Sequence, residues 1–279
     1  MVYHPLRPNA HSAESGEDRV ALTTRKPVNM ILSVALLGFI FFPAGVAASQ
    51  SMPIVSSTDR TPVLLVPGWG DEAEEVRPLR RRLAEAGWSV THLSVLTFSD
   101  PYGSNEAHVP EIAVAVDRMR QMTGVERIDI VAHSMGGLAV RRFLTRESDH
   151  GVRRVVFLGT PHHGTVAARL AWGEGAAEMI PESDFLLELN DPARSANGTE
   201  MLAIRSPLDL VVIPNSSAVL SGAENLEVCC PTHQGLLDDP QTFIQIEGFL
   251  LHGSDGLSTP EDPLLWREIR SRIPTDRDQ

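Results

Sequence analysis

From residue 61 onward, short apolar runs alternate with longer segments in which apolar residues recur every three or four positions. The short runs predict buried strands, and the three-to-four spacing predicts helices with one buried face. Strands that alternate with helices predict a mostly parallel sheet with helices on both of its faces. The expected strands are residues 61–66, 88–96, 127–132, 152–158, 200–205 and 226–230, and the expected helices are residues 72–86, 106–122, 138–145 and 241–251.

The first 48 residues have the layout of a secretory signal peptide. Arg25 and Lys26 precede an apolar run from Met30 to Phe42, and the small residues Val46-Ala47-Ala48 follow. Charge, a short apolar core and small residues before the cleavage point define such a signal, so we expect a secreted protein cleaved after Ala48. Extended to Ala48 the apolar stretch approaches the roughly 20 residues of a spanning helix. The alternative is therefore a membrane-anchored protein with its main domain outside.

The rest of the chain divides into three parts. Residues 49–60 form a polar leader, residues 61–252 contain all the expected strands and helices, and the tail 253–279 is rich in Pro and charge. Between residues 166 and 198 the apolar residues show no sustained helical or strand periodicity, and we expect short helices and loops there. The tail is expected to pack loosely.

Composition excludes several classes of protein. The formal net charge is −12, which disfavours a nucleic-acid partner because binding phosphates needs a basic face. The two cysteines, Cys229 and Cys230, are adjacent and cannot connect distant parts of the chain. They can close a vicinal ring or stay free and buried as small apolar residues, and we favour the second state.

The strongest chemical motif is Ala132-His133-Ser134-Met135-Gly136, which lies between an expected strand and an expected helix. This is the pattern of a nucleophile elbow, in which a serine occupies a sharp strand-to-helix turn. Ala132 and Gly136 are small, so the strand and the helix can approach closely. The backbone N–H of Met135 is then a candidate oxyanion donor at the helix N-terminus.

A second oxyanion donor is expected in the loop after the first strand. Residues 67–70 read Pro-Gly-Trp-Gly, and Gly68 permits a close approach of the backbone. The N–H of Trp69 could then face a substrate carbonyl. The side chain of Trp69 could equally be an ordinary core aromatic, which leaves the role of its backbone unchanged.

Three motifs together resemble those of secreted bacterial lipases and esterases of the α/β-hydrolase superfamily. They are the Pro-Gly-Trp-Gly turn, the serine motif, and Gly-Thr-Pro-His-His-Gly-Thr at residues 159–165. The serine motif begins with alanine, Ala132, and in this form it resembles the motif of the small Bacillus-type lipases. Residues 159–165 resemble triacylglycerol lipases more widely. The resemblance implies an α/β-hydrolase catalytic domain over residues 61–252, with a small or absent lid. Many relatives have His-Gly at residues 67–68 and Gly at residue 132.

In this fold the nucleophile precedes the acid, and the acid precedes the histidine. Asp209 follows the strand at residues 200–205, in a stretch that resembles the lipase acid loop, and we prefer it to the other aspartates after Ser134. His233 and His252 are the histidines after Asp209, and His233 follows an expected strand whereas His252 ends a helix. We therefore expect Ser134, His233 and Asp209 to form a catalytic triad.

No cofactor or metal site is expected. His162 and His163 are adjacent, and two neighbouring side chains make a poor chelate, so a structural role in their loop is favoured. Asp238 and Asp239 invite a calcium site, but an N-cap before Pro240 is the stronger interpretation.

These observations predict a carboxylester hydrolase that acts on lipids or other apolar acyl esters through an acyl-enzyme, with transient contact to a lipid interface. One alternative is an acyltransferase that uses the same triad. Another is a non-catalytic surface protein on a hydrolase scaffold. The sequence leaves the acyl-chain preference and the oligomeric state open.

Overall fold

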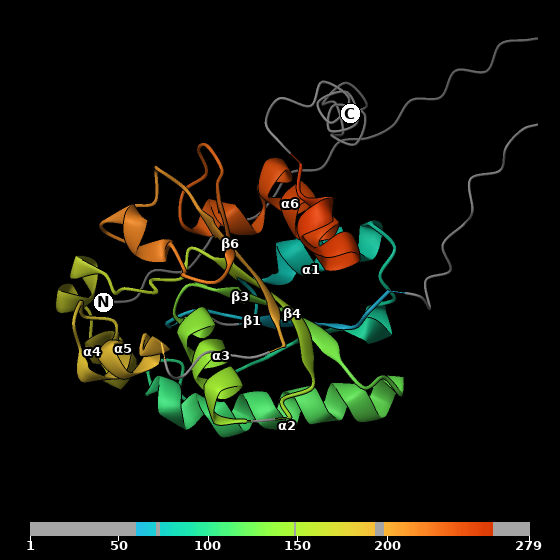
Figure 1. The fold of residues 1–279 in the computed structure, drawn as a ribbon, viewed down its shortest axis with the longest axis horizontal. Helices are drawn as coiled ribbons and strands as arrows, with labels where there is room; N and C mark the ends of the chain where they lie inside the picture. The colour runs from blue at the N-terminus through green and yellow to red at the C-terminus, as the bar shows by residue number, and fades with distance from the viewer. Residues whose placement is uncertain (1–59, 71–72, 148, 193–197, 259–279) are drawn as a thin grey trace, which may run out of the picture. The chain divides into compact units, whose positions relative to one another are not determined.

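A computed structural model describes residues 60–70, 73–147, 149–192 and 198–258. They contain a six-stranded sheet with the strand order β2-β1-β3-β4-β5-β6, in which every neighbouring pair is parallel (Figure 1). The predicted parallel sheet is therefore confirmed. Its strands are β1 (Val63–Val66), β2 (Leu93–Val95), β3 (Ile128–His133), β4 (Val152–Leu158), β5 (Glu200–Arg205) and β6 (Glu224–Glu227).

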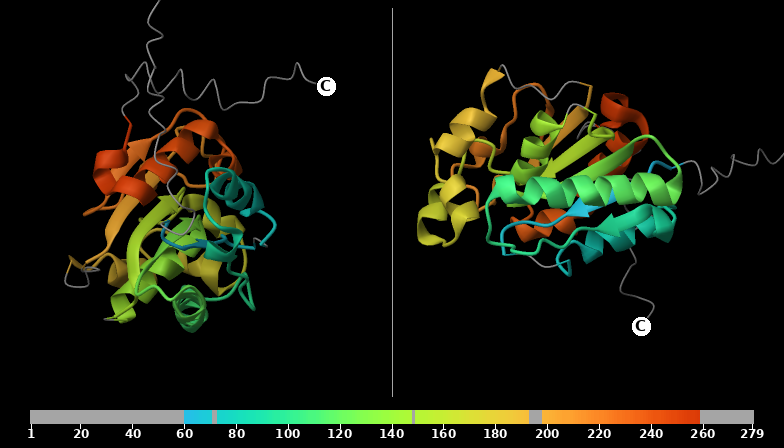
Figure 2. Two further views of the ribbon diagram at one scale, coloured as in Figure 1. Left: turned by 90° about the vertical axis from the view of Figure 1, so that its right-hand side faces the viewer. Right: turned by 90° about the horizontal axis from the view of Figure 1, so that it is seen from below.

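Helices cover both faces of the sheet, as predicted. Helices α2 (Asn105–Thr123) and α3 (Met135–Arg146) lie on one face, and α1 (Arg77–Glu85) and α6 (Pro240–His252) lie on the other (Figures 1 and 2). Helix α1 begins five residues later than its apolar spacing suggested, with a proline in its first turn. Helix α3 begins earlier than predicted, directly after Ser134.

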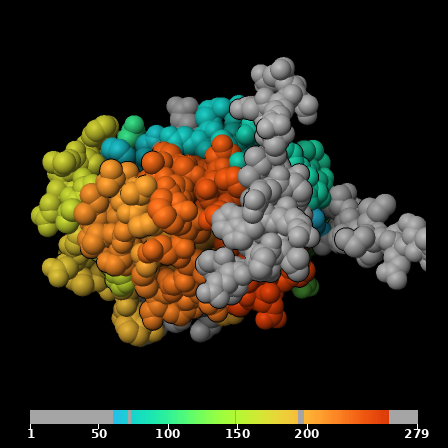
Figure 3. Space-filling view, turned by 90° about the horizontal axis from the view of Figure 1, so that it is seen from above, coloured from blue at the N-terminus to red at the C-terminus, as the bar shows by residue number. Residues whose placement is uncertain are grey.

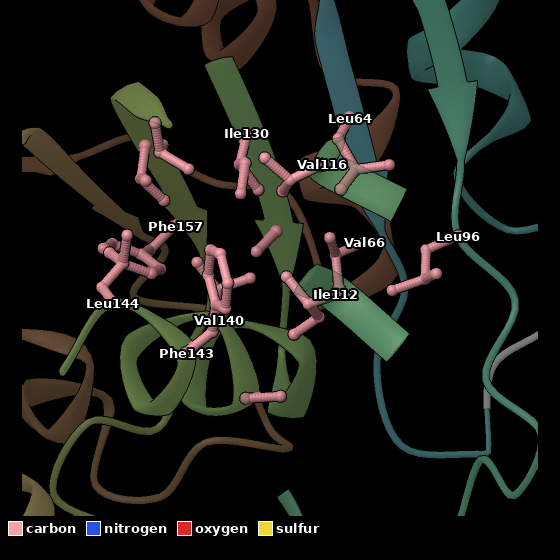
Figure 4. Close-up of a cluster of buried hydrophobic side chains, with 14 of the residues drawn as sticks. Leu64, Val66, Leu96, Ile112, Val116, Ile130, Val140, Phe143, Leu144 and Phe157 are labelled. Atoms are coloured by element: carbon pink, nitrogen blue, oxygen red, sulfur yellow. The ribbon is translucent and has the colours of Figure 1, made fainter. Parts of the chain in front are cut away.

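Strands β1, β3, β4 and β5 each contribute to two apolar cores because successive side chains point to opposite faces. In β1, Leu64 and Val66 join the core beneath α2 and α3, while Val63 and Leu65 join the core beneath α1 and α6. Figure 4 shows the first core, where side chains of β1, β3 and β4 meet those of α2 and α3. Full burial of one such side chain stabilises the fold by roughly 1.5–3 kcal/mol.

Two predicted strands differ from those observed. Residues 88–96 begin with a short 3-10 helix, η1 (Val90–His92), and only Leu93–Val95 pair with β1 as strand β2. The last strand was expected at residues 226–230 but lies at Glu224–Glu227, where it pairs with β5. It is a largely exposed edge strand, so its position depends on pairing and its apolar pattern is weak.

Short helices fill residues 166–192, as the broken pattern predicted. They are η2 (Val166–Leu170), α4 (Glu174–Glu178) and α5 (Asp184–Leu189). Further along the chain lie η4 (Asn215–Ala218), η5 (Gln234–Leu237) and η6 (Gly253–Gly256). In the space-filling view of Figure 3, residues from β5 to α6 occupy the centre of the face that is shown. Residues between η2 and α5 lie next to them at one end of that face.

The η2–α5 segment, residues 166–192, is fastened to the core. In α4, Glu178 accepts hydrogen bonds from Ser104 Oγ at 2.6 Å and from the backbone N–H of Asn105 at 2.7 Å, at the N-terminus of α2. In α5, Glu188 pairs with the buried Arg142 of α3 at 3.1 Å. This segment is therefore a fixed part of the domain, in line with a small or absent lid.

The predicted signal segment, the leader up to residue 59 and the tail beyond residue 258 lie outside the described residues. In the part of the chain that the structure describes, no helix is long and apolar enough to cross a membrane. The start of the tail packs against α6, where Gly248 and Gly256 approach so closely that a Cβ atom on either would overlap the other's backbone.

Candidate active site

Ser134 occupies a sharp turn between β3 and α3. Its backbone has φ 53° and ψ −130°, which L-residues with a side chain rarely adopt. The turn is held by its own N–H, which donates to the carbonyl oxygen of Leu158 at 2.9 Å, at the end of β4. This strained strand-to-helix turn is the geometry expected of a nucleophile elbow.

The small residues of the motif allow the turn to form. Ala132 is fully buried in β3, between Val66 of β1 and Phe157 of β4. A Cβ atom on Gly136 would overlap the carbonyl oxygen of Pro67 in the loop after β1. The helix can therefore pack against that loop because residue 136 has no side chain.

Asp209 and His233 form the acid–histidine pair that the sequence predicted. His233 Nδ1 lies 2.7 Å from Asp209 Oδ2, and both side chains are buried. The second oxygen, Asp209 Oδ1, accepts the backbone N–H groups of Val211 at 2.8 Å and Val212 at 2.9 Å. The carboxylate is thus oriented by its own loop, and it leaves Nδ1 of the ring as the hydrogen-bond donor.

The pKa of Asp209 is lowered from its ordinary value. Burial alone would raise the pKa, but the hydrogen bond and the charge of His233 together with the N–H groups of Val212 and Val211 outweigh it. Asp209 therefore stays ionised to more acidic pH than a free aspartate side chain.

The serine turn contacts the acid–histidine pair through His133, the residue before Ser134. The His133 ring, next to Ser134, lies 4.6 Å from the His233 ring, and His133 Nε2 donates to the carbonyl oxygen of His233 at 3.2 Å. Within the described residues the Ser134 hydroxyl makes no hydrogen bond, to His233 or to any other group. Catalytic hydrogen bonds are often long in unliganded enzymes and shorten when substrate binds.

Two residues of this site had no assigned role in the sequence. His133 was visible only as part of the serine motif, although its ring and Nε2 both contact His233. Gly159, at the end of β4 with φ 56°, lies beneath the acid–histidine pair. A Cβ atom there would be 3.0 Å from His233 Nδ1 and 3.1 Å from Asp209 Oδ2. The glycine of the 159–165 motif is the signal that pointed to this position.

The two candidate oxyanion donors have free N–H groups. Among the described residues, neither the Trp69 N–H nor the Met135 N–H donates a hydrogen bond. Met135 is the first residue of α3, and the first N–H groups of a helix have no acceptor within it. Met135 is fully buried, and Trp69 packs against the same apolar cluster.

The loops that follow β4 and β5 lie side by side at one end of the sheet, on the left of Figure 1. Thr165 Oγ1 donates to the carbonyl oxygen of Val211 at 2.7 Å and accepts from the N–H of Ile213 at 3.0 Å. Ser206 Oγ donates to the carbonyl oxygen of Pro231 at 2.5 Å, which joins the acid loop to the histidine loop. The site is thus built from several loops that are bonded to one another.

Of the remaining candidate ligands, His162 lies in the interior and Asp239 caps a helix. His162 is fully buried, and burial, together with the nearby charges of Arg141 and His163, lowers its pKa well below the ordinary value. Asp239 caps α6 by accepting the N–H of Thr242 at 2.7 Å, as predicted. In the described part of the chain, no group of three His, Cys, Asp or Glu side chains could hold a metal ion.

The expectation that Cys229 and Cys230 stay free and buried is wrong. Their sulfur atoms are bonded to each other, and both residues are exposed. Because β6 ends at Glu227, the cysteines lie in the loop that leads to His233 and outside the strand in which burial was expected.

Comparisons with known proteins agree with this fold. A family model described as the alpha/beta hydrolase fold matches residues 61–182. Aspergillus fumigatus lipase B is similar with a TM-score of 0.63 and 20% sequence identity, over 75% of this chain and 56% of that lipase. The mature form of the Bacillus licheniformis lipase BlEst2 is similar with a TM-score of 0.59 and 16% identity, over 69% of this chain and 91% of that one.

The described domain therefore has the α/β-hydrolase fold, as the sequence predicted. This chain spans little more than half the length of the Aspergillus lipase. At such low identities the similarity shows the fold alone. Activity, substrate and mechanism have to be argued from the site.

Proposed function

We propose that this protein is a serine carboxylester hydrolase that cleaves lipid-like esters through an acyl-enzyme on Ser134. His233 is the general base, Asp209 orients it, and the N–H groups of Trp69 and Met135 form the oxyanion hole. The main support is the 2.7 Å pair of His233 and Asp209 beside the strained turn of Ser134.

The chemistry follows from these positions. His233 takes the proton of Ser134, because an unassisted hydroxyl is a poor nucleophile at neutral pH. The serine oxygen attacks the ester carbonyl, and the negative charge that develops on the carbonyl oxygen is stabilised by the two free N–H groups. His233 then protonates the leaving alcohol. Water, deprotonated by the same imidazole, hydrolyses the acyl-enzyme and returns the proton to Ser134.

Exposed apolar side chains are concentrated in two segments that follow β4 and β5, and they favour an apolar substrate. Of the twelve large apolar side chains that are exposed in the described part of the chain, nine lie between residues 166 and 219. They belong to the η2–α5 segment and to residues 206–219, the stretch after β5 that contains Asp209. Leu170 is 91% exposed and Leu210 is 77% exposed. An exposed apolar patch of this kind typically marks a site of interaction. The nine are Val166, Leu170, Trp172, Leu187, Leu208, Leu210, Val211, Ile213 and Val219.

Charge also favours a neutral substrate. The chain carries a formal net charge of −12, which repels anionic lipids and polymers. Arg205 is the basic residue nearest the acid motif in the sequence, and it forms an ion pair with Glu227 across β5 and β6. A carboxylate or phosphate on the substrate would have to compete with Glu227 for it.

Catalytic efficiency should rise with acyl-chain length. We expect kcat/KM to increase about 10- to 100-fold from acetate to octanoate esters, because each buried CH₂ group contributes roughly 0.8 kcal/mol and part of the chain lies on the apolar surface. The measurement is a hydrolysis series with p-nitrophenyl esters from acetate to laurate, supplemented by a tricaprylin emulsion. Ser134→Ala protein, assayed with each substrate, provides the background.

The series separates two kinds of enzyme. If efficiency is greatest with acetate and tricaprylin is not hydrolysed, the protein is a small-ester hydrolase, and the lipid part of the proposal is wrong. If the Ser134→Ala variant hydrolyses the esters as fast as wild type, the nucleophile is wrong as well.

Activity should be lost on acidification through a single proton. Protonated His233 cannot accept the serine proton, so kcat/KM should fall tenfold per pH unit once the imidazole is protonated. The lowered pKa of Asp209 keeps its carboxylate ionised at pH values above the ordinary aspartate value of about 3.9, and its charge is lost only below that value. A pH–rate profile tests this, and a limiting slope of two above pH 4 would show that Asp209 titrates together with the histidine.

We further propose that the domain is exported and that the mature chain begins near Ser49. The support is the short apolar run and the small residues before Ser49. N-terminal sequencing of protein recovered from the culture medium should find Ser49. A membrane-bound product that retains residues 30–42 would favour the anchored form instead.

A further inference from the structure

Three aromatic side chains from distant parts of the chain meet beside the candidate oxyanion loop. The Trp69 ring makes edge-to-face contacts with Tyr102 and Trp172, each at 5.0 Å between centroids, and Tyr102 lies 5.5 Å from Trp172. Trp69 Nε1 also donates to the carbonyl oxygen of Trp172 at 3.2 Å. We call Trp69, Tyr102 and Trp172 the aromatic clamp.

Tyr102 is enclosed by glycines on both sides. A Cβ atom on Gly70, where φ is 68°, would lie 2.8 Å from the Tyr102 ring. A Cβ atom on Gly173, where φ is 87°, would lie 2.5 Å from the Tyr102 carbonyl oxygen. The N–H of Gly70 donates to the carbonyl oxygen of Pro101 at 3.0 Å. This hydrogen bond joins the candidate oxyanion loop, residues 67–70, to the loop that contains Tyr102.

The start of α4 also packs closely against Met135, the other candidate oxyanion donor. A Cβ atom on Gly175 would lie 2.5 Å from Met135 Sδ and 2.6 Å from the carbonyl oxygen of Gly103. The N–H of Gly175 donates to the carbonyl oxygen of Tyr102 at 3.1 Å. The start of α4 therefore contacts the Tyr102 loop and Met135 together, and Glu178 of α4 fixes it to α2.

From this geometry we infer that Tyr102 and Trp172 are positioning residues that hold the Trp69 N–H in the oxyanion hole. The inference rests on the proposed function. The backbone N–H and the indole of Trp69 are carried by adjoining bonds of one residue, and the Gly70 N–H holds the peptide that follows it. Contacts that fix the indole therefore also restrict the direction of the Trp69 N–H. The clamp holds the indole through two ring contacts and one hydrogen bond, and an oxyanion hole works best when its donors are fixed before the reaction.

The exposure of Trp172 makes the inference testable. Its side chain is 64% exposed, so its loss should have little effect on stability. Met122, which is 66% exposed near the end of α2, lies outside the apolar surface described above, makes none of the clamp contacts and is a matched control. A role in folding alone would therefore affect the melting temperature, whereas a positioning role would affect the transition state.

The experiment compares wild type with Trp172→Ala, Trp172→Phe and Met122→Ala. For each, kcat and KM are measured with p-nitrophenyl butyrate, and the inhibition constant is measured with butylboronic acid. Ser134 Oγ adds to the boron and its proton passes to His233, which gives a tetrahedral boronate whose negative charge lies where the oxyanion forms. Melting temperatures are recorded in parallel.

Trp172→Ala should lower kcat about 10- to 100-fold and raise the boronate inhibition constant by a similar factor, with KM changed less than threefold. A misplaced oxyanion donor has effects of this size. Trp172→Phe should recover most of the activity, because the acceptor for Trp69 Nε1 is a backbone oxygen and a ring is retained. Met122→Ala should resemble wild type in both constants.

The inference is overturned if Trp172→Ala keeps kcat and the boronate affinity, or if Met122→Ala loses them equally. It is also overturned if kcat falls without any change in boronate affinity, because the oxyanion hole would then be intact. Failure of the proposed function is recognised separately, in wild type: the protein would not hydrolyse the ester, and a fluorophosphonate would not label Ser134.

Discussion

Replacing Ser134 with alanine should lower kcat by roughly five to six orders of magnitude while the fold is retained. The nucleophile and its base act as a unit, so removal of the serine oxygen eliminates the acyl-enzyme route and leaves only the effects of binding and the oxyanion hole. The hydroxyl makes no hydrogen bond within the described residues, and alanine at the same positive φ carries the same backbone strain.

The measurement combines kcat with a circular-dichroism melting curve and with fluorophosphonate labelling. Ser221→Ala, which changes an exposed serine on the loop before β6, is the matched control and should keep full activity. Retention of activity within tenfold of wild type by Ser134→Ala would mean that another residue is the nucleophile. Loss of labelling in Ser134→Ala with an unchanged melting curve would support the assignment.

The sequence made parts of this site predictable because they depend on local rules. A small-residue turn between a strand and a helix predicts the position of Ser134. The order of acid and histidine after it, together with their places after expected strands, favours Asp209 and His233. The structure brings these last two within 2.7 Å of each other. The parallel sheet followed in the same way from strands that alternate with helices.

Other parts could not be predicted, because they depend on contacts between distant segments. Tyr102 has no motif around it, and its place beside Trp69 arises only when the loops after β1, β2 and β4 meet. The position of β6 is set by pairing with β5, while its own residues are mostly polar. The error for Cys229 and Cys230 follows from that shift, since both were assigned to the strand and to the interior.

Replacing Asp209 with asparagine should lower kcat about 10⁴-fold while the acid loop keeps its conformation. The asparagine side-chain oxygen can still accept the N–H groups of Val211 and Val212, so the loop contacts persist. Its NH₂ group then faces His233 Nδ1 and donates to it, which favours the tautomer with its proton on Nε2. That nitrogen can no longer accept the proton of Ser134, and the imidazolium loses the negative charge that stabilised it.

A control variant distinguishes the loss of His233 orientation from the loss of one negative charge on the protein. Asp238 lies just before α6, and its carboxylate pairs with Arg82 of α1. Asp238→Asn removes that carboxylate and should leave kcat unchanged. The melting temperature of Asp209→Asn should fall near neutral pH, because a carboxylate with a lowered pKa stabilises the fold above its ordinary titration range, and that contribution is absent in the variant. At pH values below the lowered pKa, wild type loses the same contribution and the two melting temperatures should converge. Should Asp209→Asn retain more than a tenth of the wild-type kcat, His233 is oriented by another group, and the buried 2.7 Å contact serves only the stability of the loop.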